Sequence, residues 1–496
     1  MSILEKIKKL ESKEVFKWFE TISKIPRESG HEKEISDFLV EFAKERNFEV
    51  YRDSVNNVII KKCGTLDYKS KSPIIIQGHM DMVCEKTKDS KHNFKKDGIE
   101  LIIEGDILRA NSTTLGADDG IAISIGLALL DSKNIAHPPI EFLATTSEET
   151  GMDGALAITE EHLSGKSLIN IDSEEEGIFL VSCAGGLNAL AEFEIKREKI
   201  LKTDFDQFLK IEISDLKGGH SGIEIYKQRA NAIKILGRLL YAVKKDICLS
   251  FIEGGTKPNA IAKNSETIII TKDANKIKNI LEELAKKIKN EYKAEDSEMK
   301  IKIYKCKNVK ECISKRISDN IIDFMNLAPD GVLYMDRDIK GLVQTSANNG
   351  VLKEENGKLT FTILIRSSIE SSLNEIASIV EIASKRTNAK FKRVNEYPAW
   401  EFDSNSKIKD KAVKIYKKIT GKNAKIKSIH AGLECGILKK VLPKVDMISI
   451  GPDIKDVHTP NEHLSISSVD RTRKFLKVIF YSLFISSMVK PVILFL

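Results

Sequence analysis

The sequence predicts an α/β protein in which helices cover both faces of a central, mostly parallel sheet, and in which a second α/β domain made of two similar halves is inserted. Three observations predict this class. Short β-branched runs alternate with helical segments at both ends of the chain. Acidic residues and histidines follow the predicted strands, and the middle of the chain repeats one pattern twice. With 496 residues, the chain is long enough for two large domains.

The two ends of the chain share one rhythm of strands and helices. We expect strands at residues 57–63, 73–77, 140–146, 166–172 and 444–451, and helices at 32–47, 118–132, 405–420 and from about Ser467 onward. Because the last hundred residues repeat the pattern of the first part, both can complete one sheet. We therefore predict a discontinuous domain of residues 1–184 and 398–496, with residues 185–397 inserted.

The inserted segment contains a weak internal repeat. Thr256 and Asn259 form a Thr-x-x-Asn pattern that precedes a turn and a β-branched strand, and Thr345 and Asn348 form a second one. An amphipathic helix precedes each copy and another follows it. This repetition predicts two similar α/β halves.

Composition and charge exclude several classes of protein. The net charge of +7 comes from 79 basic and 72 acidic residues that are mixed along the chain, which indicates solvated surfaces and not a nucleic-acid groove. The seven cysteines include no CxxC pair, so reduced thiols in a cytoplasm are expected. The N-terminus lacks the apolar core of a signal peptide. The apolar residues 475–496 are interrupted by Lys477, Lys490 and Pro491, so we expect a helix packed on the sheet instead of a membrane span.

Five clusters of histidine and acidic residues lie at predicted strand ends. His79 and Asp81 are two residues apart after an isoleucine run, so both side chains point to one side of the carboxyl edge of the sheet. The other clusters are Asp118 with Asp119, Glu148 with Glu149, Asp172, and His458. Each has an ordinary explanation by itself, because surface acids are common, acids cap helices and a lone histidine is usually structural. Together, without a cysteine, they predict a site for a hard or borderline metal ion.

Nine motifs follow one another along the chain: IPRESGHEKEISDFL, QGHMDMV, TLGADDG, SEETGMDGA, NIDSEEEG, GGHSG, GGTKPNAI, HAGLECGIL and MISIGPDIKDVHTPNE. They resemble those of the aminoacyl-histidine dipeptidases, also called cytosol non-specific dipeptidases or peptidase D, within the di-zinc aminoacylase and carboxypeptidase group of metallopeptidases. The resemblance covers nearly the whole chain. So many motifs in this order make the resemblance specific.

The resemblance implies a role for each cluster. His79 and Asp172 resemble ligands of one zinc ion, Asp118 the carboxylate that bridges two ions, and Glu149 and His458 the ligands that complete the two sites. Asp81 resembles the acid that orients His79, and Glu148 the general base that takes a proton from a metal-activated water and returns it to the leaving amine. The family also implies a cis peptide bond between Asp118 and Asp119.

The resemblance further implies substrate-binding residues in the inserted lid domain. His220 resembles an oxyanion donor, although a histidine in a glycine-rich turn explains it too. Asn259 and Arg366 resemble partners of the substrate backbone and carboxylate, and a surface salt bridge is the alternative for the arginine. His430 and Glu434 line the site or begin a helix. One departure affects loop geometry and substrate preference: Ala262 and Lys263 stand where the family has proline and arginine.

We therefore expect a cytoplasmic metallo-dipeptidase that hydrolyses unblocked dipeptides, including those of the Xaa-His type. Its cofactors are two divalent ions, with zinc expected and manganese or cobalt left open. The alternatives are an N-acyl amino acid deacylase, a tripeptidase, or a non-catalytic scaffold of the same fold. The partners are dipeptide substrates, without nucleic acid or membrane, and a homodimer through the lid domain is left open.

Overall fold

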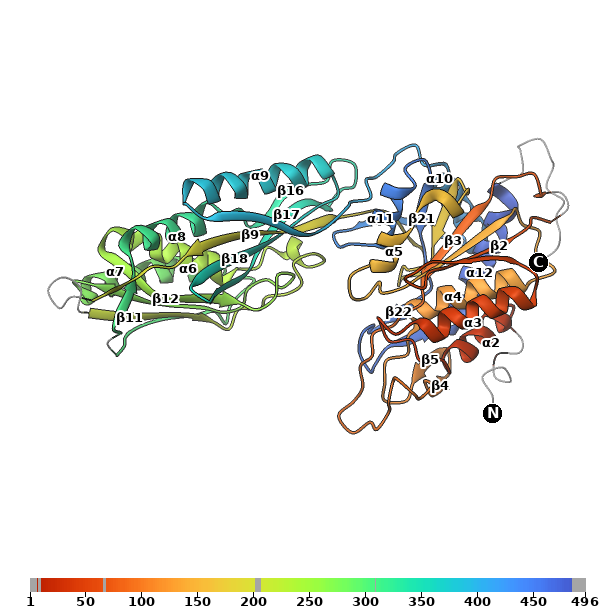
Figure 1. Cartoon of the computed structure of the whole chain (residues 1–496), viewed down its shortest axis with the longest axis horizontal. Helices are drawn as coiled ribbons and strands as arrows, with labels where there is room; N and C mark the ends of the chain where they lie inside the picture. Colours follow the sequence, from red (N-terminus) through yellow and green to blue (C-terminus); the bar gives the residue numbers. More distant parts are fainter. Residues whose placement is uncertain (1–6, 8–9, 66–67, 201–206, 308, 484–496) are drawn as a thin grey trace. The chain divides into compact units, whose positions relative to one another are not determined.

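The chain divides into two compact units (Figure 1). A computed structural model describes residues 7, 10–65, 68–200, 207–307 and 309–483. Unit 1 comprises Met1–Val181, Phe402–Lys427 and Glu434–Leu496, and unit 2 comprises Ser182–Glu401 and Ser428–Leu433. The short segment at residues 428–433 belongs to unit 2, where the amide of Ala184 donates to the carbonyl of Ile429 and the Ser428 hydroxyl donates to that of Ser182.

Unit 1 is built on an eight-stranded sheet with a parallel centre. The strands are, in spatial order, β1 (Glu49–Arg52), β2 (Val58–Lys62), β6 (Ile140–Thr145), β3 (Ile74–His79), β7 (Ser167–Asn170), β21 (Asp446–Ser449), β8 (Ile178–Cys183) and β20 (Lys425–Ile429). Strands β6, β3, β7 and β21 run parallel, whereas β1, β2 and β8 pair antiparallel with their neighbours. The mostly parallel centre expected from the buried isoleucine and leucine runs is confirmed.

Helices cover both faces of this sheet. They are α2 (Lys13–Ile22), α3 (Lys33–Glu45), α4 (Ala117–Asp131), α5 (Asp153–Ala157), α10 (Lys407–Thr420), α11 (Glu434–Val441) and α12 (Ile466–Leu483). Along β3 the side chains alternate. A Cβ on Gly78 would meet Ala122 of α4, whereas the Gln77 amide donates to Glu434 at the start of α11 on the opposite face. The buried core contains apolar residues of α2, α3, α4, α10 and α12, including Phe16, Leu39 and Phe480.

The register of the parallel strands brings their carboxyl ends to one edge. His79 pairs with Thr145, and Gln77 pairs with Asn170. The loops that follow these strands therefore begin side by side, and each carries one of the predicted clusters. A second, four-stranded sheet joins distant parts of unit 1, in the order β22 (Ile454–Lys455), β23 (His463–Ser465), β5 (Ile107–Ala110) and β4 (Leu101–Glu104).

In its described residues, unit 2 has a nine-stranded antiparallel sheet and four α-helices. Its strands are β9 (Gly185–Glu194), β11 (Gln207–Ser214), β12 (Ile247–Gly255), β13 (Ser265–Thr271), β14 (Lys300–Lys305), β16 (Gly331–Met335), β17 (Val343–Glu355), β18 (Lys358–Ser367) and β19 (Lys390–Tyr397). The helices are α6 (Ala232–Val243), α7 (Ala274–Glu291), α8 (Lys315–Leu327) and α9 (Glu370–Arg386), and a short ribbon pairs β10 (Arg197–Lys199) with β15 (Glu311–Ile313).

The two halves of unit 2 have the same topology. From the edge to the centre of the sheet, one half runs β14-β11-β13-β12 and the other runs β19-β9-β18-β17. Each half therefore places its fourth, first, third and second strands in that order. Helices α6 and α7 flank the second and third strands of one half along the chain, and α8 and α9 flank those of the other. The predicted pair of similar halves is confirmed.

The predicted closing helix is present as α12, which ends at Leu483 in the described part of the chain. The rest of the apolar C-terminal tail lies outside the described residues. Among the helices of the described residues, none combines the length and the apolar character that crossing a membrane requires.

Candidate metal centre

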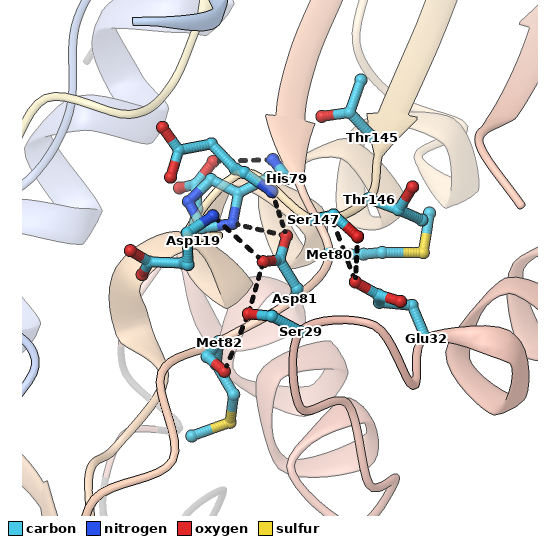
Figure 2. A network of polar contacts seen from close by, with 12 residues as sticks. Ser29, Glu32, His79, Met80, Asp81, Met82, Asp119, Thr145, Thr146 and Ser147 are labelled. Atoms are coloured by element: carbon cyan, nitrogen blue, oxygen red, sulfur yellow. Dashed lines mark hydrogen bonds and ion pairs between the residues drawn. The ribbon is translucent and has the colours of Figure 1, made fainter. Parts of the chain in front are cut away.

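His79 ends strand β3 and lies at the centre of a polar network (Figure 2). Its side chain is 1% exposed, and its two ring nitrogens face different carboxylates. Nδ1 lies 3.3 Å from Asp81, whereas Nε2 lies 3.2 Å from Asp118 and 3.8 Å from Asp172. An imidazole held between an orienting acid and an acidic cluster is the usual arrangement of a histidine that binds metal.

Asp81 connects His79 to the turn that carries the two glutamates. Its carboxylate accepts hydrogen bonds from the backbone amides of Glu148 (3.1 Å) and Glu149 (3.2 Å) and from the Ser29 hydroxyl (2.8 Å). Figure 2 shows the serine and the imidazole on either side of this carboxylate. These hydrogen bonds of the completely buried Asp81 hold the end of β3 against the turn that follows β6.

The carboxylate of Asp118 lies between two histidines. One oxygen is 3.2 Å from Nε2 of His79, and the other is 3.1 Å from Nε2 of His458. His458 also lies 2.9 Å from Glu149. The peptide bond between Asp118 and Asp119 is cis, as the resemblance implied.

Among the described residues, three groups could each hold a metal ion, because the ligand atoms within each group lie within 4.8 Å of one another. They are His79, Asp118 and Asp172; Asp118, Glu149 and His458; and His79, Glu148 and Glu149. The first two share Asp118 and contain all five residues expected as ligands. This sharing fits a pair of adjacent ions bridged by one carboxylate. We refer to these two groups as the His79 triad and the His458 triad.

The electrostatics of these residues suit a bound cation. Burial raises the pKa of Glu148 and of Asp172 well above the usual range, and neighbouring carboxylates raise both further. Hydrogen bonds to Asp118 and Glu149 raise the pKa of His458 to about 11. Divalent ions bound to these groups would supply positive charge that favours the deprotonated carboxylates.

Asp119 differs from its neighbour. It belongs to none of the three ligand groups found among the described residues, and its carboxylate accepts the backbone amide of His79 at 3.1 Å. Its side chain is buried, and a Cβ on Gly78 would collide with it. Of the two adjacent aspartates, one therefore faces the ligand groups and the other holds the end of β3.

A second buried network lies next to the expected ligands and was not predicted from the sequence. The Asn170 amide donates to Gln77 at 2.7 Å, and the Gln77 amide donates to Glu434 at 2.6 Å. The Thr145 hydroxyl donates to the same Glu434 oxygen at 2.8 Å. Asn170 and Gln77 each lie two residues before an expected ligand, Asp172 and His79 respectively. Glu434, expected either to line the site or to begin a helix, does begin α11 and also ties three strand ends together.

His220 lies in unit 2, and its surroundings fix its tautomer. Its Nδ1 accepts hydrogen bonds from the backbone amides of Gly222 (3.1 Å) and Ile223 (3.2 Å). The ring proton must therefore be on Nε2. Burial and the charge of Arg366 lower the pKa of His220, which keeps the ring neutral. His220 therefore presents a single N–H donor, which is the chemistry expected of an oxyanion donor.

Asn259 lies beside this turn in unit 2. Its carbonyl accepts the backbone amide of Ser221 at 2.9 Å. The amide of Asn348 donates to the carbonyls of Pro258 (2.8 Å) and Ala260 (2.9 Å), so the loop is held on both sides of Asn259. Ala262, which stands where the family has proline, does not loosen this loop. The residue is buried, and its carbonyl accepts a hydrogen bond from the backbone amide of Ala232.

Arg366 is buried without an acidic partner among the described residues. It is 6% exposed, and Nη1 donates to the hydroxyl of Tyr397 at 2.6 Å, whereas Nε has no hydrogen-bond partner there. His430 lies in the same polar region, 2.7 Å from the Ser346 hydroxyl. Burial and the charges of Arg366 and His220 lower the pKa of His430 to about 3. A buried guanidinium with free donors suits an anionic guest.

Two further residues near the ligands have no counterpart in the expectations from sequence. Arg27 is buried at 2% exposure and donates to backbone carbonyls beside His79. Glu462 is equally buried and accepts backbone amides beside Asp118. Both lie in motifs that carried the resemblance, IPRESG and VHTPNE. Their place in these motifs was the one feature of the sequence that could have pointed to them.

Comparison with known proteins identifies close relatives. The chain is 37% identical over 455 residues to the cytosol non-specific dipeptidase of Escherichia coli (strain K12), a match that covers 91% of this chain and 93% of the relative. The crystal structure of the aminoacylhistidine dipeptidase from Vibrio alginolyticus superposes with a TM-score of 0.89 at 34% sequence identity. That match covers 96% of this chain and 97% of the other.

A more distant structure shares the fold. The aminopeptidase PepT from Bacillus cereus superposes with a TM-score of 0.54 at 16% identity, covering 95% of this chain and 98% of the other. Residues 75–481 match the family described as Peptidase family M20/M25/M40, and this range contains every residue of the two triads. With most of its length matched and its ligand groups inside the matched range, the chain belongs to peptidase family M20/M25/M40.

Proposed function

We propose that this protein is a metal-dependent dipeptidase that hydrolyses the peptide bond of unblocked dipeptides, including those of the Xaa-His type, in the cytoplasm. Two similar proteins are named as dipeptidases, and one of these names includes the cytosol. The observation that carries the proposal is the shared carboxylate of Asp118, because it makes two ligand triads into one dinuclear site. We propose zinc as the ion at both positions.

The proposed ligands are His79 and Asp172 for one ion, Glu149 and His458 for the other, and Asp118 for both. When bound, two divalent ions polarise a carbonyl and make a water molecule acidic near neutral pH. Asp81 holds His79 in place and keeps its Nε2 directed at the ligand group.

Glu148 is the proposed general base. It belongs to a ligand group with His79 and Glu149, and its backbone is fixed by Asp81. A raised pKa favours a carboxylate that takes a proton and returns it to the leaving amine.

We propose that unit 2 supplies the substrate-binding groups. The single Nε2–H donor of His220 suits a developing oxyanion, and the free donors of Arg366 suit the carboxylate of a dipeptide. Asn259 is proposed to bind the substrate backbone. Residues 185–397 are proposed as the lid domain, and pairing of two copies through it stays a prediction that sedimentation of the purified protein tests.

A reconstitution experiment tests this proposal. Protein stripped of metal is supplied in turn with zinc, manganese and cobalt, and then given dipeptides, tripeptides and N-acetyl amino acids. We expect hydrolysis of dipeptides with a free amine and little hydrolysis of the blocked compounds. Preference for the N-acetyl compounds would instead indicate a deacylase. If metal binds and none of these substrates is cleaved, the protein is a scaffold and the proposal is wrong.

A further inference from the structure

Arg27 is a buried arginine whose partners are backbone carbonyls. Nη1 donates to Met80 (3.3 Å) and Asp81 (3.2 Å), and Nη2 donates to Gly116 at 2.6 Å. Burying a guanidinium is costly unless its donors are satisfied. Here Nη1 and Nη2 are satisfied by the two segments that carry His79 and Asp118, whereas Nε has no hydrogen-bond partner among the described residues.

Glu462 is a buried carboxylate whose partners are backbone amides. Its Oε2 accepts from Leu115 (2.7 Å) and Gly116 (2.9 Å), and its Oε1 accepts from Ala117 (2.7 Å) and Asp118 (3.2 Å). Four consecutive amides at the start of helix α4 thus converge on one side chain. Such bonds to an ionised acceptor are among the stronger hydrogen bonds in proteins.

The two side chains meet at Gly116. Arg27 binds its carbonyl, and Glu462 binds its amide. The residue has a φ of 66°, and a Cβ there would collide with Arg27 and Met82. Only glycine fits this backbone without strain between the two charged groups. The segment 115–118 is therefore held from both sides, and its last residue is the aspartate shared by the two triads.

Glu462 also connects Asp118 to the loop of His458. The amide of Glu462 donates to the carbonyl of Thr459 at 3.0 Å, which closes a short turn directly after His458. The His458 loop and the Asp118 segment are therefore connected twice, once by the contact between His458 and Asp118 and once through Glu462. Arg27 makes the corresponding connection between the His79 loop and the same segment.

We propose that Arg27 and Glu462 are positioning residues that fix segment 115–118 so that the Asp118 carboxylate faces both triads at once. This inference rests on the proposed dinuclear site. Without Glu462, the segment and the His458 loop can move independently, so the His458 triad should lose affinity more than the His79 triad. Residues that orient metal ligands typically change metal affinity by about 10-fold to 100-fold when they are replaced.

The test uses Glu462→Gln, which keeps the shape of the side chain. An amide group replaces one of the two oxygens, so two of the four backbone amides lose their acceptor. Mn²⁺ is titrated into the full-length, metal-stripped protein, and free Mn²⁺ is measured. We expect one of the two ions to bind about 10-fold or more weakly than in the wild type. With a dipeptide as substrate, kcat should fall while KM changes little.

Glu141→Gln is the matched control. Glu141 is also 2% exposed and accepts backbone amides, those of Ser164 (3.0 Å) and Gly165 (2.9 Å), but it lies at the opposite end of β6 from the ligands. Both variants should be less stable in urea, and the control should keep the Mn²⁺ affinity of the wild type. Equal loss of affinity in the two variants would mean that stability, and not positioning, explains the effect.

A second variant covers the case in which Glu462→Gln does not fold. Arg27→Lys keeps the positive charge but replaces the planar fork by a single ammonium group. It should weaken Mn²⁺ binding to at least one site. A folded variant of either kind with both ions bound as in the wild type would overturn the inference alone. A wild-type protein that binds neither Mn²⁺ nor Zn²⁺ would instead overturn the proposed function.

Discussion

Nε2 of His458 lies 3.1 Å from Oδ2 of Asp118, although the two residues are 340 positions apart in the chain. The other oxygen of the same carboxylate lies 3.2 Å from His79. A single side chain thus connects the strand end at His79 with a loop near the C-terminus. Two ion sites that share a ligand should depend on that ligand more than on any other.

Asp118→Asn should therefore impair both sites. The amide keeps the shape but loses the charge and one of the two acceptor oxygens, so both ions should bind on the order of 100-fold or more weakly. Asp172→Asn is the comparison, because Asp172 belongs to the His79 triad alone. It should retain about one ion per chain. Metal content is measured after dialysis, and equal contents in the two variants would contradict a shared carboxylate.

Glu148→Gln should separate metal binding from turnover. Because Glu148 is proposed to move protons, and not to belong to either triad, its replacement should leave two ions bound. It should lower kcat by about 10²-fold to 10⁴-fold. Glu160→Gln is the control, because it changes an exposed glutamate that also follows strand β6 in the chain. Its kcat and metal content should match those of the wild type. Turnover retained in Glu148→Gln would remove this residue as the base.

Much of unit 1 could be predicted because its signals are local. The run Ile74–Ile76 is buried on both sides, as expected for the centre of a parallel sheet, and its register brings His79 level with the end of β6. Strand ends that carry acids or histidine are visible in the sequence, and the fold then brings them to one edge. The two similar halves of unit 2 could be predicted for the same reason, because the repeated pattern of helices and strands is local in the sequence.

The contacts that hold the ligands could not be predicted in this way. Arg27 and Glu462 bind backbone groups, and every residue offers the same backbone groups, so no pattern of residue types marks the partners. Gln77 and Glu434 are 357 positions apart, and their hydrogen bond depends on how α11 packs against the sheet. The four-stranded sheet that joins β5 to β23 was missed because its strands are short and partly exposed.

Arg366→Met should identify the charge that this arginine binds. If its free donors hold the carboxylate of the substrate, the variant should lose about 10-fold to 100-fold in kcat/KM for dipeptides, from hydrogen bonds to a charged group. Dipeptide amides lack that charge, so the variant and the wild type should cleave them at similar rates. The comparison requires both substrates with both proteins. An equal loss for both would show that Arg366 supports the fold of unit 2 instead.

His430 should make unit 2 less stable at acidic pH. The folded protein holds the pKa of this buried imidazole at about 3, below its usual value of 6.5. Below about pH 6.5 the unfolded chain binds a proton that the folded chain refuses, so the free energy of unfolding falls as pH falls, by about 1.4 kcal/mol per pH unit. The loss begins near pH 6.5 and continues until the folded imidazole is protonated, near pH 3.

The measurement compares the wild type with His430→Gln, which cannot titrate. Both are unfolded in urea with EDTA present, so that release of metal does not contribute. In a Trp18→Phe background, the buried Trp400 is the sole tryptophan and reports on unit 2. From about pH 7 to about pH 5, the wild type should lose about 2 kcal/mol more than the variant. A stability difference between the two proteins that stays constant with pH would mean that His430 takes up a proton equally well in the folded and unfolded protein. Burial and the positive charge of Arg366 would then not lower its pKa, and this account of its surroundings would be wrong.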